Sequence, residues 1–110
     1  MTKIYKPYNY YRKYTVKNLE KLLKSRDKLV ISAYAHGNAE AVEWLIDIEL
    51  IIKECRFSKN QLEIIRLYYF GGMTQTAVAE ELGLTQQGVM KRIYTIRQRL
   101  KKAVETWGDN

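Results

Sequence analysis

The 110-residue chain contains one cysteine, one histidine and one proline. Cys55 therefore has no partner for an internal disulfide, and a single histidine, His36, leaves no set of residues with metal-site spacing. This cysteine content is typical of a reducing compartment, so we expect a cytoplasmic protein. Neither a metal nor another cofactor is expected.

Long hydrophobic runs are also missing. No apolar segment approaches the roughly 18 residues of a membrane span, and no apolar core follows the basic residues at the N-terminus. No nucleophile with a neighbouring base, carboxylate pair or phosphate-binding loop can be assembled into one site. We therefore assign no catalytic residue and expect no enzymatic activity, no small-molecule substrate and no membrane partner.

Positive charge, by contrast, is in excess. Nineteen Lys and Arg residues oppose twelve Asp and Glu residues, which gives a formal net charge of +7. Such a balance favours a polyanionic partner, and nucleic acid is the first candidate. With 46% apolar residues, a chain of this length has enough material for the core of one compact domain.

Residues 1–14 form a basic, tyrosine-rich segment that has no helical period and no acid. Pro7 keeps the residue before it out of the helical region, so we predict an extended arm. Two roles for its tyrosines remain open. They either stack on bases while the cations meet phosphates, or pack on the domain or on a dimer partner.

From residue 15 onward, the apolar spacing predicts an all-α fold, a bundle of about five helices. A first helix, capped by Thr15, is expected to run to Gly37 with an apolar stripe that includes Tyr34. Asn38 caps a second, acidic helix that extends to about Arg56. Together, residues 15–56 are expected to form a helical hairpin that either packs on the rest of the chain as one core or provides a dimerisation surface.

Residues 57–107 have the pattern of a helix-turn-helix unit. Ser58 and Gln61 match a capping box, and the helix that they begin should stop at Gly71 and Gly72. A short helix over Gln75–Leu82 and a long helix from Thr85 to Trp107 follow. Gly83 separates these last two helices, as expected for a helix-turn-helix.

The last helix is the expected DNA-reading element. Between Thr85 and Lys102 it carries six cations and no acid. The side chains expected to read base edges in the major groove are Gln86, Gln87, Met90, Lys91 and Tyr94. The residues expected to contact the DNA backbone are Thr74, Gln75, Thr85, Arg92, Arg97, Arg99, Lys101 and Lys102.

Residues 57–100 resemble region 4, the C-terminal DNA-binding domain of bacterial sigma factors. The resemblance lies in the order of the parts, which are a capped helix ending in Leu-Tyr-Tyr-Phe, a glycine turn, a V-A-E-x-L-G helix and a T-x-x-x-V-x-x-R-I helix. It implies a last helix that docks in the major groove of a promoter element and a surface that touches RNA polymerase. Gly88 departs from the family, which often has a side chain there, and the preceding 56 residues do not resemble other sigma regions.

The sequence therefore predicts a sequence-specific regulator of transcription that binds double-stranded DNA. Its layout is similar to that of the stand-alone sigma-like regulators of phages and other mobile elements, and this resemblance implies a protein of that type. RNA polymerase and a second copy of the chain are its other expected partners. Two alternatives remain open: a DNA-recognition subunit of a phage packaging or assembly machine, and a polymerase-binding module that does not touch DNA.

Overall fold

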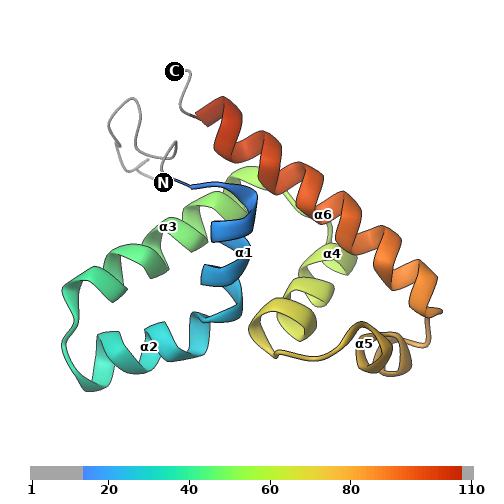
Figure 1. Ribbon diagram of the computed structural model, residues 1–110, viewed down its shortest axis with the longest axis horizontal. Coiled ribbons are helices and arrows are strands. Elements are labelled where there is room, and N and C mark those ends of the chain that lie inside the picture. The colour runs from blue at the N-terminus through green and yellow to red at the C-terminus, as the bar shows by residue number, and fades with distance from the viewer. Residues whose placement is uncertain (1–13, 108–110) are drawn as a thin grey trace.

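The computed structural model describes residues 14–107, apart from the side chains of Thr106 and Trp107. Within that range the chain forms six α-helices and one π-helical segment, and it contains no strand (Figure 1). The elements are α1 (Val16–Lys24), α2 (Arg26–Ala35), α3 (Ala39–Cys55), α4 (Lys59–Ile64), η2 (Ile65–Phe70), α5 (Gln75–Leu82) and α6 (Gln86–Trp107). The predicted all-α fold with a C-terminal helix-turn-helix is confirmed. Predictions for the arm before Tyr14 and for the side chain of Trp107 lie outside the described residues.

Helix α1 lies in the middle of the molecule. Figure 1 shows the α2–α3 hairpin on one side of α1 and the helices α4 and α5 on the other, with α6 crossing above them. α1 packs against η2, α3 and α6, so residues 14–56 and the helix-turn-helix share an interface. In the region that the structure describes, no helix combines the length and the apolar content of a membrane span.

The prediction of a single helix from residue 15 to Gly37 is wrong, because the helix is interrupted at Ser25 and forms two helices, α1 and α2. The reason is the spacing of the apolar residues. Leu23 and Leu29 are six residues apart, so a straight helix would place them about 120° apart around its axis. The break allows both side chains to enter the core, where they are 1% and 8% exposed. Tyr34, which was expected on the buried stripe, is 84% exposed.

Helices α2 and α3 form a hairpin. Gly37 has a φ of +61°, a conformation that favours glycine, and the Asn38 side chain accepts a hydrogen bond from the Ala41 backbone N–H at 3.2 Å. On α3, Asp47 is fully buried and accepts a 2.6 Å hydrogen bond from the Tyr14 hydroxyl. This bond fixes Tyr14, two residues before α1, to the middle of α3.

The capping box that begins α4 is confirmed. The Gln61 backbone N–H donates to the Ser58 hydroxyl at 3.2 Å, and the Ser58 backbone N–H donates to the Gln61 side chain at 2.9 Å. The helix then widens into η2 instead of continuing as an α-helix. This wider turn buries Ile65 and Tyr69, which are 1% and 0% exposed.

The two glycines that end η2 have different functions. Gly71 has a φ of −83°, which any residue can adopt, but a Cβ atom there would lie 2.7 Å from the Leu67 carbonyl oxygen. Gly72 has a φ of +68° with open space around it. Gly71 is therefore required by close backbone approach and Gly72 by its conformation.

Candidate nucleic-acid interface

The turn between α5 and α6 has the geometry of a helix-turn-helix. Gly83 has a φ of +67°, and the Leu84 N–H donates to the Ala79 carbonyl oxygen at 2.9 Å. The Thr85 hydroxyl then accepts a 3.0 Å bond from the Gly88 N–H and caps α6. A side chain at Gly88 would place its Cβ atom 3.1 Å from this hydroxyl. Gly88 thus offers no side chain for reading bases, but its lack of a side chain leaves room for the Thr85 cap.

The buried side of α6 fastens it to the rest of the domain. Val89 and Ile96 are fully buried, and Ile93 is 5% exposed. They pack in one core with Val78 and Ala79 of α5, which are 0% and 5% exposed. Because this side is fixed, the opposite side of the first turns of α6 is presented outward.

All five residues predicted to read bases are exposed on α6, and two of them are large apolar side chains. Met90 is 52% exposed and Tyr94 is 62% exposed, and Gln86, Gln87 and Lys91 are exposed as well. Gln87, Met90 and Tyr94 are three and four residues apart, so they share one side of the helix. Their contact with bases stays a prediction.

The residues predicted to contact the DNA backbone are less uniform. The hydroxyls of Thr74 and Thr85 already accept backbone hydrogen bonds as helix caps. Gln75 is half-buried. Arg92 lies on the side of α6 that faces α4, where it lines a cavity of about 160 Å³ with Asn60 and other residues of α4 and the turn.

Arg97 belongs to a polar network that joins three elements. Its Nε atom lies 3.2 Å from Oε1 of Glu20 on α1, and Oε2 of the same carboxylate accepts a 2.7 Å bond from the hydroxyl of Tyr69 on η2. Burial, and after it the hydrogen bond to Glu20, raises the pKa of the Tyr69 phenol well above its ordinary value. Glu20 and Arg97 fix α6 relative to α1.

The sequence analysis missed the roles of Glu20 and Tyr69. One signal was present, since Glu20 is the only acid among the first 26 residues. The position of Glu20 in the sequence does not reveal that it pairs with Arg97, because Arg97 is 77 positions further along the chain and on another helix.

Arg99 points in a different direction from Arg97. Its guanidinium donates hydrogen bonds to the backbone carbonyls of Cys55 at 3.3 Å and Arg56 at 3.1 Å, at the end of α3. Arg56 has a φ of +52°, and the positive charge of Arg99 lies beside the negative end of the α3 dipole. Burial raises the pKa of the neighbouring Cys55 thiol from 9.0 to about 11, although the charge of Arg99 opposes this shift.

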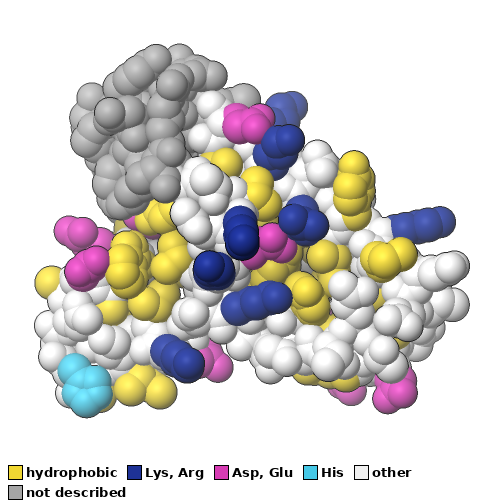
Figure 2. Space-filling view, viewed as in Figure 1, with side chains coloured by type: hydrophobic (Ala, Val, Ile, Leu, Met, Phe, Trp, Pro, Cys, Tyr) yellow, Lys and Arg dark blue, Asp and Glu magenta, His cyan; other side chains and the backbone are white. Residues whose placement is uncertain are grey.

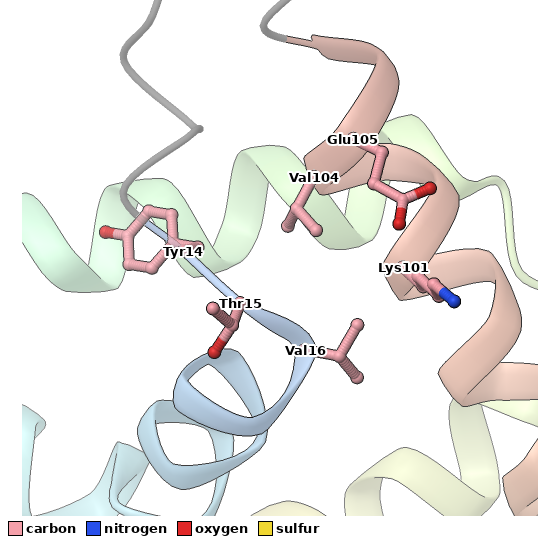
Figure 3. A pocket seen from close by; sticks show the side chains of 6 residues that line it. All are labelled: Tyr14, Thr15, Val16, Lys101, Val104 and Glu105. Carbon is pink, nitrogen blue, oxygen red and sulfur yellow. The ribbon is translucent and has the colours of Figure 1, made fainter.

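Lys101 lies where the last turns of α6 approach the start of α1. With Val104, Glu105 and residues 14–16 it lines an open cavity of about 530 Å³, and Figure 3 shows Val16 and Val104 facing this space. Lys102 is exposed. Arg97 and Lys101 thus lie on the side of α6 that faces α1, and Arg99 lies on the side that faces α3. Their DNA contacts stay predictions.

Charge is distributed unevenly over the molecule. Figure 2 shows Lys and Arg side chains gathered where α1 meets the middle of α6, with acidic side chains mostly near the edges of the view. Such an arrangement raises the local concentration of a polyanion at this face.

These features define the class of the protein, which is a helical protein with a helix-turn-helix domain at its C-terminal end. Residues 57–106 match the family model described as Sigma-70, region 4. This segment is a sigma region 4-like helix-turn-helix, and the family is one of DNA-binding domains. Residues 14–56 lie outside the match. No curated protein and no solved structure matched the chain.

Proposed function

We propose that the protein is a sequence-specific regulator of transcription that acts by binding double-stranded DNA and not by catalysis. The first turns of α6 enter the major groove, where Gln87 bonds the edge of an adenine and Lys91 that of a guanine. Met90 contacts a thymine methyl group. The phosphate contacts that surround this site set its position and do not read sequence.

The observation that carries the proposal is the exposure of the first turns of α6. Buried Val89 and Ile93 fix the inner side of the helix, while Met90 and Tyr94 project 52% and 62% exposed into solvent. Met90 and Tyr94 lie four residues apart, so they form one exposed patch that can meet a partner. The match of residues 57–106 to region 4 supports DNA as that partner.

Two further partners belong to the proposal. RNA polymerase is implied by the resemblance to region 4, and co-purification of core polymerase with the protein in the absence of DNA tests it.

A second copy of the chain is supported by exposed apolar side chains on the α2–α3 hairpin, where Ile31 is 57% and Tyr34 is 84% exposed. Light scattering tests this contact, because a dimer that becomes monomeric in Tyr34→Ser supports it and a large ring would instead favour a packaging subunit.

The experiment that tests the function is selection of binding sites from random duplexes at a fixed, stated salt concentration, since phosphate-driven affinity falls steeply with salt. We expect enrichment of one short motif. Specific binding to that motif should exceed binding to scrambled duplex by at least about a thousandfold, as for other specific DNA-binding proteins. Equal affinity for every duplex would contradict a specific reader.

A further inference from the structure

Helix α1 has a solvent-exposed basic side. Its lysines share this side at intervals of four and three residues: Lys17, Lys21 and Lys24. The opposite side enters the core through Leu19 and Leu23, which are 0% and 1% exposed. Glu20 is the only acid of α1, and it is already paired with Arg97. The exposed charge of α1 is therefore positive.

Aromatic rings of η2 extend this basic side toward α2. The Lys24 Nζ atom lies 5.0 Å from the centre of the Tyr68 ring, and the Arg26 guanidinium lies 4.9 Å from that of Phe70. Both distances are within the range of a cation–π contact. The residues that make up this surface, here called the α1 basic band, are Lys17, Lys21, Lys24, Arg26 and Arg97. Figure 2 shows the basic side chains of this region on one face of the molecule.

The α1 basic band begins where a DNA backbone should pass if α6 reads the major groove. Met90 and Arg97 are seven residues apart, so they share a side of α6 and are separated by about 10 Å along its axis. The major groove is about 12 Å wide. With Met90 inside the groove, Arg97 reaches its phosphate border, and the ion pair to Glu20 brings α1 to the same border.

We infer that α1 is a second DNA-binding element, and that Lys17 and Lys24 contact backbone phosphates on the flank of the site that α6 reads. This inference rests on the proposed function. It assigns a binding role to residues outside the region 4-like segment, and the contact is independent of sequence because it engages phosphates only. Glu20 does not oppose it, since Arg97 and Tyr69 hold both of its oxygens.

The test compares two duplexes that contain the selected motif, one ending at the motif and one extended by about ten base pairs, or one helical turn, on each side. Affinities of the wild type, Lys17→Gln, Lys24→Gln and the double variant are measured by fluorescence anisotropy between 50 and 200 mM salt. Lys53→Gln is the matched control, because it removes the same charge from an exposed position on α3, outside the α1 basic band. Thermal unfolding checks that each variant is folded.

We expect the wild type to bind the extended duplex more tightly than the short one, and the double variant to lose that gain. For the extended duplex, each α1 substitution should reduce the slope of log affinity against log salt by about 0.9. The advantage of the wild type over the double variant should therefore shrink about twelvefold between 50 and 200 mM salt. Lys53→Gln should keep the slope of the wild type.

Two results would overturn the inference while leaving the proposed function intact. One is equal affinity of the wild type for both duplexes, and the other is an unchanged salt slope in the α1 variants. Failure of the wild type to bind either duplex would contradict the proposed function, and this inference with it.

Discussion

Removal of the Tyr69 hydroxyl tests the network that joins α1, η2 and α6. The Tyr69 ring is fully buried, and its hydroxyl donates to Glu20 at 2.7 Å. In Tyr69→Phe the ring still fills its space, so the change removes one hydrogen bond to a charged acceptor, which is worth about 1.5–3 kcal/mol. The Glu20 side chain is 19% exposed, so water replaces part of this interaction. We expect the free energy of unfolding to fall by about 1–2 kcal/mol.

Urea denaturation followed by circular dichroism measures this change, and the midpoint of thermal unfolding should fall by roughly 4–8 °C. The matched control is Tyr68→Phe, which removes a hydroxyl from the adjacent, half-buried tyrosine. A loss below about 0.5 kcal/mol for Tyr69→Phe, or equal losses for the two variants, would refute the argument that the bond to Glu20 stabilises the fold.

Three further predictions concern the ends of helices. Gly71→Ala should lower the free energy of unfolding by about 2 kcal/mol or more, because its Cβ atom would lie 2.7 Å from the Leu67 carbonyl oxygen; urea denaturation checks this, and a neutral effect would contradict the close approach. Arg99→Ala should lower the free energy of unfolding by about 1 kcal/mol in the same assay, because its hydrogen bonds to the end of α3 are lost. Arg99→Lys should restore only part of this free energy. Cys55, with a pKa raised from 9.0 to about 11, should be alkylated by iodoacetamide at pH 8 about a hundredfold more slowly in the folded protein than in urea. Since its folded pKa is the higher one, its contribution to stability is constant below pH 9.0 and is lost as the pH rises toward 11, a fall that Cys55→Ala should lack.

Most of the helix boundaries follow from local chemistry, which is why they could be predicted from the sequence. Thr15, Asn38 and Ser58 each accept the hydrogen bond expected of an N-cap, because a cap needs only a side chain and a backbone N–H three residues away. Gly83 has the positive φ that the turn requires. These local rules were enough to predict the helix-turn-helix and to place the five residues predicted to read bases on its exposed side.

Features that depend on distant residues could not be predicted in the same way. The break at Ser25 arises because two apolar stripes must reach one core, and this requirement becomes visible only when the other helices are in place. The partner of Arg97 is on α1 and those of Arg99 are at the end of α3. Because both residues are arginines on one basic helix, the sequence predicted the same role, contact with the DNA backbone, for both.

The claim that the first turns of α6 read DNA sequence is tested most directly by replacing single glutamines of this helix with alanine. Gln87→Ala and Gln98→Ala remove the same exposed side chain from one helix, about 16 Å apart along its axis. Affinities for the selected duplex and its single-base variants are measured at one salt concentration. Gln87→Ala should lose about 1–3 kcal/mol of discrimination at one base pair, and Gln98→Ala should keep the preference of the wild type. Unchanged discrimination in Gln87→Ala, or an equal loss in Gln98→Ala, would contradict the account.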